Sequence, residues 1–209
     1  MNSPIYNLRP RRQGAIPDVV FILLIANGLV YALERFSPEF VVGHFALFPV
    51  ESGFFRPWQL LTYGFLHDLN NLYHIGFNMF GLWMFGRQIE PMMGPKRFLF
   101  YYMTCIIGAG IIQLIVSAVQ GGVYFTVGAS GGLMGILLAY AMAFPNRTIM
   151  LIIPPIPMKA KYFVLIFALA SIYFGVSGVV PGVAHFAHLG GMLFGFVLLQ
   201  YWNKPRRRG

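Results

Sequence analysis

The chain has 209 residues, of which 57% are hydrophobic and only 10% are charged, whereas soluble globular domains carry about 25% charged residues. This composition excludes an ordinary soluble domain and indicates a membrane protein, and the length suits one compact domain. The 15 Lys and Arg residues outnumber the 6 Asp and Glu residues, but their positions follow membrane topology, so no nucleic-acid partner is expected. The single cysteine, Cys105, excludes an internal disulfide.

The first third of the chain predicts a short tail, one membrane helix and a mixed loop. Residues 1–15 are polar and lack the apolar core of a secretory signal peptide, so we expect a cytoplasmic N-terminal tail. Residues 16–35 are apolar and predict the first membrane helix. Residues 36–69 mix aromatic rings with scattered charges, which suits the lipid headgroup level, and we expect a partly embedded, partly helical loop there.

The rest of the chain predicts further membrane helices. An uncharged segment predicts a helix at 70–89, and a turn rich in Pro and Gly is expected from Glu90 to Arg97. Residues 98–146 contain no charged residue and are too many for one span of about 20 residues. The chain therefore crosses twice here, with a break at 120–122. Four more helices are expected, at 97–119, 130–145, 160–176 and 183–203. A basic cytoplasmic tail at 204–209 follows them.

The helix expected at 130–145 is short. About 15 residues of α-helix reach roughly 22 Å, which is less than the roughly 30 Å hydrocarbon core of a bilayer. We therefore expect this helix to begin below the membrane surface, with Ser130 at its start. Residues 16–203 as a whole are expected to form one all-α, polytopic membrane domain of six helices.

Six spans place both termini on the same side, and the basic residues indicate which side. With a cytoplasmic N-terminus, every Lys and Arg except Arg35 and Arg56 lies on the cytoplasmic side. This asymmetry matches the positive-inside rule and accounts for the net charge of +9. The missing presequence and the six-span layout favour a multi-pass protein of a bacterial plasma membrane.

Polar residues collect at one depth of the predicted bundle. The second, fourth and sixth helices all start on the outer side, and near those starts lie His74 with Asn78, Ser130, and His185 with His188. Polar side chains at membrane depth are costly and usually face a bundle interior or a water-filled cavity. The two pairs are spaced four and three residues apart, so the members of each pair share a helical face. These residues predict a convergent polar site.

Structural roles are alternatives for each of these residues. Ser130 could cap the N-terminus of its helix or be a small residue that allows close packing. His74 and Asn78 could serve only in hydrogen bonds to a neighbouring helix. One of His185 and His188 could be structural. Gly131 and Gly191 each begin a small-xxx-small pair that lets the fourth and sixth helices approach closely. We accept this packing interpretation for the glycines, and the same close approach would bring Ser130 to His188.

Two other chemistries do not fit. Residues 128–132 match the letters of the G-x-S-x-G nucleophile elbow, but that motif needs an Asp or Glu and then a His later in the chain. No Asp or Glu follows Glu90. A metal site built from His74, His185 and His188 has no supporting cysteine cluster, HExxH motif or nearby carboxylate. No metal and no cofactor are therefore expected.

The remaining chemistry is a Ser–His dyad. A serine hydroxyl becomes a nucleophile when a histidine takes its proton, and the histidine can later protonate the leaving amine. Ser130 is the expected nucleophile. His74, Asn78 and the backbone N–H of Ser130 at a helix start are the expected donors to the oxyanion of the tetrahedral intermediate.

Three motifs, in this order, carry a family resemblance: His74-x-x-x-Asn78, Gly128-Ala129-Ser130-Gly131, and Ala187-His188-Leu189-Gly190-Gly191 followed by Gly195. Together with the flanking Phe65-Leu66-His67, Glu90, Gly94 and Arg97-Phe98, they resemble the rhomboid intramembrane serine proteases over roughly residues 56–195. The resemblance implies the six-helix bundle of the bacterial type. It also implies that Ser130 is the nucleophile, His188 the general base, and His74 with Asn78 the oxyanion-hole side chains.

The resemblance further implies an endopeptidase that works in the lipid bilayer and cleaves transmembrane segments of single-span or polytopic membrane proteins near the outer face. The alternative is a catalytically inactive rhomboid-like protein that binds transmembrane clients, although such relatives lack the serine or the histidine. A solute transporter would show internal repeats, and none is visible in the sequence. The identity of the substrate and the oligomeric state do not follow from the sequence.

One position departs from the family pattern. Rhomboids often carry an aromatic residue four positions after the serine, packed against the catalytic histidine, and this position is Met134. A thioether can also contact a ring, so we expect an adjusted dyad. Gly128, Gly131, Met134 and His185 are expected to support the site. Substrate entry is expected to need movement of the helix at 160–176 and of the glycine-containing loop at 175–182.

Overall fold

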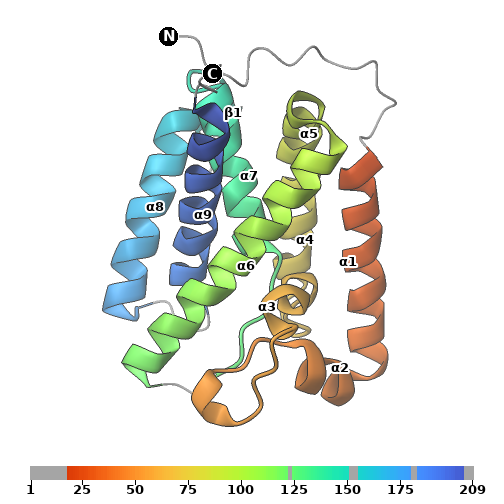
Figure 1. The fold of residues 1–209 in the computed structure, drawn as a ribbon. Coiled ribbons are helices and arrows are strands. Elements are labelled where there is room, and N and C mark those ends of the chain that lie inside the picture. The colour runs from red at the N-terminus through yellow and green to blue at the C-terminus, as the bar shows by residue number, and fades with distance from the viewer. Residues whose placement is uncertain (1–17, 122–123, 151–154, 180–182, 205–209) are drawn as a thin grey trace, which may run out of the picture.

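The computed structural model of the chain describes residues 18–121, 124–150, 155–179 and 183–204. The expected tail at 1–15 and nearly all of the tail at 204–209 lie outside the described residues. Figure 1 shows the described residues as a bundle of helices, which confirms the predicted all-α polytopic membrane fold. Its long helical columns are α1 (Asp18–Phe36), the continuous run of α4 (Leu72–Gly81), η4 (Leu82–Gly86) and α5 (Arg87–Met93), α6 (Pro95–Gln120), α7 (Ser130–Ala143), α8 (Ala160–Ser177) and α9 (His185–Asn203).

The helices differ in their ability to cross a bilayer alone. Among the described residues, α1, α6 and α8 are long and apolar enough to span a membrane, and α7 is apolar but shorter. With 14 residues, α7 is about 21 Å long. Figure 1 shows the chain after α6 rising from the bottom of the view into the bundle before α7 begins. The first residue of α7 therefore lies inside the bundle and not at its end.

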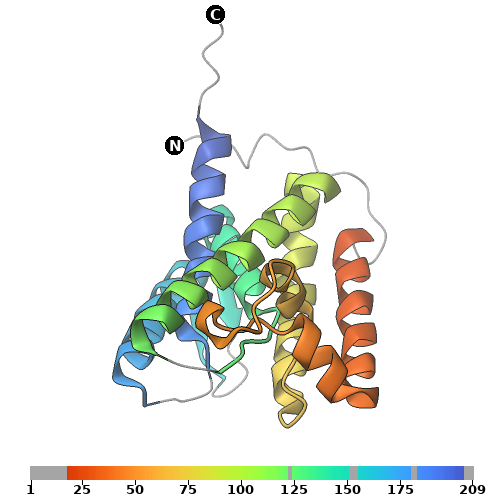
Figure 2. The ribbon, with the colours of Figure 1, turned by 60° about the horizontal axis from the view of Figure 1, so that its bottom comes forward.

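The mixed loop after α1 folds into short helices: α2 (Pro38–Phe45), η2 (Val50–Ser52), α3 (Gln59–Thr62) and η3 (Tyr63–Phe65). Figure 2 shows these elements between α1 and α6 at the end of the bundle that comes forward in that view. Leu47 in this loop exchanges two backbone hydrogen bonds with Thr126, at 3.0 and 2.9 Å. This bridge ties the loop to the segment that leads into α7.

The expected turn from Glu90 to Arg97 is wrong. The second column continues helically to Met93, through a π-helical stretch at η4 and past Pro91, and α6 begins at Pro95. Only Gly94 makes the turn, with φ of 78° and an N–H that donates to the carbonyl of Glu90 at 2.8 Å. A proline is tolerated at the first turn of a helix, so Pro95 starts α6 and does not extend the turn.

Glu90 anchors the start of α1 to α5. Its side chain is 1% exposed, and its carboxylate accepts hydrogen bonds from the N–H groups of Val19 at 3.0 Å and Val20 at 2.9 Å. N–H groups in the first turn of a helix have no partner within the helix. Glu90 therefore caps a helix that lies far from it in the sequence and fixes α1 beside the second column.

A pair of short strands lies between α7 and α8 in the chain and was not predicted. β1 (Thr148–Met150) pairs antiparallel with β2 (Pro157–Lys159), with Ile149 opposite Met158. Strands of three residues give no alternating hydrophobic pattern that could be detected in the sequence.

The core is built where α6, α7 and α9 meet. Tyr101, Tyr102 and Cys105 of α6 are fully buried there. A Cβ on Gly131 would overlap the side chain of Ala109 on α6, and one on Gly191 would overlap the carbonyl oxygen of Gly131. The backbones of α7 and α9 therefore touch directly, as the small-xxx-small interpretation requires.

The glycines of the same motifs also serve a third helix. A Cβ on Gly195 would lie 2.5 Å from the hydroxyl oxygen of Tyr101 and 3.0 Å from the sulfur of Cys105. A Cβ on Gly135 would overlap the same sulfur. The glycines that join the fourth and sixth helices therefore also make room for α6.

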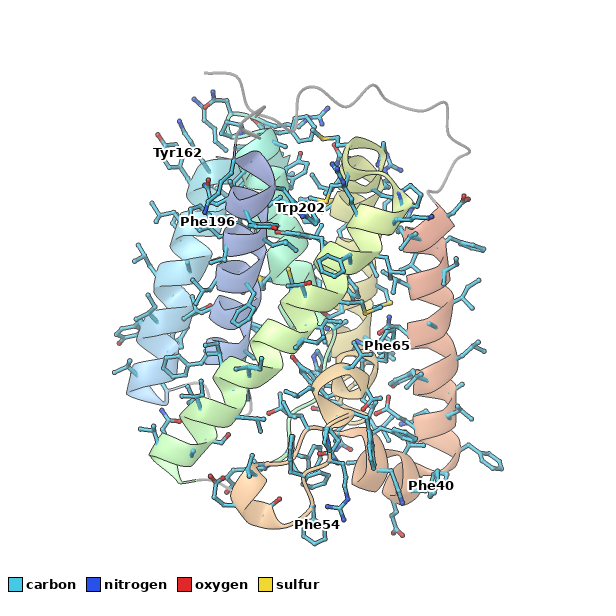
Figure 3. All side chains as sticks on the ribbon, viewed as in Figure 1. Phe40, Phe54, Phe65, Tyr162, Phe196 and Trp202 are labelled. Carbon is cyan, nitrogen blue, oxygen red and sulfur yellow. The ribbon has the colours of Figure 1, made fainter. Side chains whose placement is uncertain are left out.

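Basic residues and aromatic rings mark the two ends of the bundle. At the end that carries α5 and β1, four cations lie over rings at 4.7 to 5.9 Å: Arg87 over Trp83, Arg97 over Trp202, Arg147 over Phe144 and Lys161 over Tyr162. Figure 3 shows Tyr162 and Trp202 toward this end and Phe40 and Phe54 at the other. Aromatic rings at both ends are typical of the two interfaces of a membrane.

Candidate functional site

Ser130 and His188 form a hydrogen bond across the bundle. Ser130 is the first residue of α7 and His188 lies in the first turn of α9. The Nε2 atom of His188 lies 2.8 Å from the hydroxyl oxygen of Ser130, and the pair is only partly buried. A serine hydroxyl at this distance from an imidazole nitrogen can pass its proton to it.

The hydroxyl of Ser130 is not used to cap its helix. The N-cap of α7 is Ala129, which makes no side-chain capping hydrogen bond. The hydroxyl of Ser130 is hydrogen-bonded to His188 instead. The capping alternative therefore does not account for a serine at this position.

His74 lies beside the serine, on α4. A Cβ on Gly128 would lie 2.8 Å from Nε2 of His74 and 3.6 Å from the hydroxyl oxygen of Ser130. His74 and Ser130 therefore both lie next to the backbone of Gly128. The backbone N–H of Asp68 donates to Nδ1 of His74 at 3.2 Å. Because Nδ1 accepts, Nε2 of the neutral ring carries the proton and can donate it to a bound group.

Asn78 stands one turn after His74 on the same face of α4. Its side chain is 4% exposed, and its amide nitrogen donates to the carbonyl oxygen of His74 at 2.9 Å. An amide NH2 group has two donor hydrogens. One hydrogen therefore fixes the side chain against the helix, and the other can be donated to a bound oxyanion.

Gly128 brings α7 into this site. Its φ of +134° is a conformation that L side chains rarely adopt, and its N–H donates to the carbonyl oxygen of Tyr63 at 3.0 Å. The hydroxyl of Tyr63 in turn donates to the carbonyl oxygen of Ile106 at 2.7 Å. Tyr63 thus links the loop before α4, the start of α7 and the centre of α6. No motif in the sequence pointed to Tyr63.

As a test of the Ser–His dyad expected from the sequence, Gly128→Ala is predicted to lower the turnover number about 100-fold, which is the usual cost of losing one oxyanion donor. The new methyl group would displace Nε2 of His74, and the backbone strain would cost about 1 to 3 kcal/mol of stability. Gly53→Ala is the control, because Gly53 also has a positive φ of 77° but has no atom within 4 Å of the added Cβ. Equal turnover in the two variants would contradict the role given to Gly128. Both are compared by cleavage kinetics and thermal unfolding.

His185 belongs to the wall of the site. It is 8% exposed, and its ring centroid lies 6.3 Å from that of His188 and 5.6 Å from that of Phe174 on α8. Its position supports a packing role beside His188. Within the described ranges, no group of three or more His, Cys, Asp or Glu side chains could hold a metal ion.

The aromatic contact to His188 comes from a helix other than the one that carries Met134. Met134 is 8% exposed and lies in the main hydrophobic core. The aromatic ring that contacts His188 comes from Phe167 on α8, with ring centroids 5.8 Å apart. No pattern in the sequence indicated Phe167, because its residue type is common in membrane helices.

A second histidine, His67, lies behind His74. It is 1% exposed, with its ring centroid 5.2 Å from that of His74. Burial, and then the neighbouring His74, lower the pKa of His67 to about 4, so this ring is neutral at pH 7 and places no positive charge beside His74. The carboxylate of Glu34, also buried, accepts the backbone N–H of His67 at 3.0 Å. The motif Phe65-Leu66-His67 was the one sequence signal for this residue.

The sequence of the chain is similar to the sequences of known proteins. The model of the rhomboid domain matches residues 55–203. Rhomboid protein 1, mitochondrial, of Saccharomyces cerevisiae is 31% identical over 148 residues, which are 65% of this chain and 41% of the yeast protein. The presenilin-associated rhomboid-like protein, mitochondrial, of Rattus norvegicus is 27% identical over 187 residues, covering 87% of this chain and 48% of the rat protein.

A bacterial relative covers more of the chain. Rhomboid protease GlpG of Yersinia pestis is 27% identical over 196 residues, which are 92% of this chain and 64% of the Yersinia protein. The chain spans about half the length of the mitochondrial relatives that it matches. Because the rhomboid model covers well over half of the chain, this membrane protein belongs to the rhomboid family.

Proposed function

We propose that the chain is an intramembrane serine endopeptidase that cleaves transmembrane segments of other membrane proteins near the outer face of the membrane. The observation that carries the proposal is the 2.8 Å contact between Nε2 of His188 and the hydroxyl oxygen of Ser130. Family membership supports it, since a relative in this family is named a protease.

In the proposed reaction the hydroxyl oxygen of Ser130 attacks the carbonyl carbon of the substrate while its proton moves to Nε2 of His188. The resulting oxyanion accepts hydrogen bonds from Nε2–H of His74, from the Asn78 amide and from a backbone N–H at the start of α7. His188 then gives its proton to the leaving amine, and an acyl-enzyme remains. A water molecule that His188 deprotonates hydrolyses the acyl-enzyme and restores the hydroxyl.

The side of α4 that faces away from His74 and Asn78 is suited to contact with an apolar, helical substrate. A groove of about 450 Å³ runs along this face, lined by Leu72, Tyr73, Gly76, Phe77 and Phe80. The same helix carries His74 and Asn78 on its other side. The carbonyl groups of a substrate helix are already hydrogen-bonded in lipid, so the helix around the cleaved bond must first unwind. Small or helix-destabilising residues at the cut are therefore proposed as the preferred sequence.

The proposed topology follows the charge distribution. The described Lys and Arg residues lie at the end with α5, β1 and the C-terminus of α9, except Arg35 and Arg56 near α2 and α3 (Figure 1). By the positive-inside rule the basic end faces the cytoplasm, so the site lies toward the outer side. The expected location in a bacterial plasma membrane stays a prediction, since the relatives include mitochondrial proteins.

The test uses a serine-directed fluorophosphonate and a single-span model substrate with purified protein in detergent. Wild-type protein is expected to be labelled at Ser130 and to cleave the substrate. Ser130→Ala is expected to do neither, because the nucleophilic oxygen is gone. A wild-type protein that binds the substrate helix without labelling or cleavage would show a non-catalytic rhomboid-like binder and would refute the proposal.

A further inference from the structure

His188 lacks the hydrogen bond that orients the base of a serine triad. In a triad, a carboxylate accepts the Nδ1–H of the histidine and holds the ring in its productive orientation. The described part of the chain offers Nδ1 of His188 no hydrogen-bond partner, and no Asp or Glu follows Glu90 in the sequence. The orientation of this ring therefore depends on the bond to Ser130 and on the side chains packed against it.

Two rings pack on the imidazole of His188. Phe167 of α8 lies 5.8 Å from it, centroid to centroid, with an angle of 47° between the rings. His185 lies 6.3 Å away at 86°. Phe174 of α8 holds His185 in turn, at 5.6 Å. Aromatic pairs at these distances stabilise each other beyond the burial of their area. The faces of α8 and α9 that meet here are thus joined by a row of four rings.

The two phenylalanines are placed for this contact by the helical repeat. Phe167 and Phe174 are seven residues apart and lie on the same face of α8. One residue further on, Gly175 leaves room for Phe186 of α9, since a Cβ there would lie 2.8 Å from the Phe186 ring. Both helices therefore present aromatic residues to the seam on which His188 lies.

Helix α8 is less buried than α1 or α6. Only 17% of its most apolar stretch of 18 residues is buried inside the structure, against 39% for α6, and its buried residues are the small or medium Ala160, Val164 and Ser171. The aromatic contacts to α9 are consequently a large share of what fixes α8. A displacement of α8 would withdraw the Phe167 ring from His188.

We propose that Phe167 is the positioning residue for His188, and that its ring holds the imidazole in the orientation that places Nε2 at the hydroxyl of Ser130. The resemblance led us to expect an aromatic residue at position 134 against the catalytic histidine, where the chain has Met134, and Phe167 supplies such a ring from α8. Because Phe167 belongs to α8, the alignment of the base is coupled to the position of that helix. This inference rests on the proposed protease function.

The test compares Phe167→Ala, Phe167→Leu and Phe167→Tyr with wild-type protein and with Leu169→Ala, a change on the same helix at a side chain that is 57% exposed. Loss of the ring is expected to lower kcat about 100-fold, the scale of an ångström of misplacement, with little change in KM. The rate of labelling by a small fluorophosphonate is expected to fall in parallel, since that reaction needs the dyad but no substrate helix. Phe167→Tyr keeps the ring and is expected to stay close to wild type, as is Leu169→Ala.

Two results would overturn the inference while leaving the proposed function intact. The first is a Phe167→Leu protein, folded by thermal unfolding, with wild-type kcat and labelling rate, because a ring would then not be needed. The second is a Phe167→Ala protein that cleaves faster and labels no more slowly, which would mean that Phe167 only restrains α8. A wild-type protein that neither cleaves nor labels would instead refute the protease function itself.

Discussion

Ser130→Ala and His188→Ala are each expected to lower cleavage of a single-span substrate by about a thousandfold or more, leaving a residual rate that a sensitive assay measures. Each removes one end of the same 2.8 Å contact: the first removes the attacking oxygen, and the second removes the group that accepts its proton. Residues that act as a unit in serine proteases lose far less on the second replacement than on the first. The double variant is therefore expected to be no slower than either single variant.

The measurement is cleavage by purified protein, with thermal unfolding to show that each variant is folded. His44→Ala is the matched control, because His44 is exposed on α2 and its side chain hydrogen-bonds to the carbonyl oxygen of Phe40 within its own helix. It is expected to cleave at the wild-type rate. Retained cleavage in a folded His188→Ala protein would disprove its role as the base. Multiplicative losses in the double variant would show that the two residues act separately.

Much of this arrangement was predictable because membranes restrict what a sequence can form. A bilayer excludes unpaired backbone groups, so the charge-free stretches had to become helices and their boundaries followed the charged residues. Polar side chains at membrane depth are costly, so Ser130, His74 and the histidines near 185 stood out from an apolar background. The all-α membrane fold followed from these signals, and family membership followed from the resemblance of three motifs; both are confirmed.

The contacts that complete the site could not be predicted, because they join residues that are distant in the sequence. Phe167 looks like any other apolar residue of a membrane helix, and its contact with His188 depends on how α8 is rotated against α9. Tyr63 reaches Gly128 and Ile106 through one backbone group and one hydroxyl. The turn near Gly94 was predicted too long because proline and glycine were both read as breakers, although Pro95 starts a helix and Pro91 is tolerated within one.

Gly191→Ala is expected to destabilise the folded protein by forcing α7 and α9 apart. In Gly191→Ala the added Cβ would overlap the carbonyl oxygen of Gly131 and lie 2.7 Å from its carbonyl carbon. Both atoms belong to the backbone of α7, so no side chain can rotate away, and the two helices must separate. Overpacking of this kind costs about 3 kcal/mol, and a lower thermal unfolding temperature in detergent is expected.

The same separation reaches the site. Gly131 follows Ser130 directly, and Gly191 lies one turn after His188, so helices that part at the glycines also part at the hydrogen bond between Ser130 and His188. Fluorophosphonate labelling of the folded fraction is therefore expected to slow together with the loss of stability. Gly28→Ala is the control, because Gly28 lies in α1 with no atom within 4 Å of an added Cβ, and alanine favours a helix over glycine by about 1 kcal/mol. Wild-type stability and labelling in Gly191→Ala would mean that α7 and α9 do not meet at these glycines, and the approach of Ser130 to His188 would then need another cause.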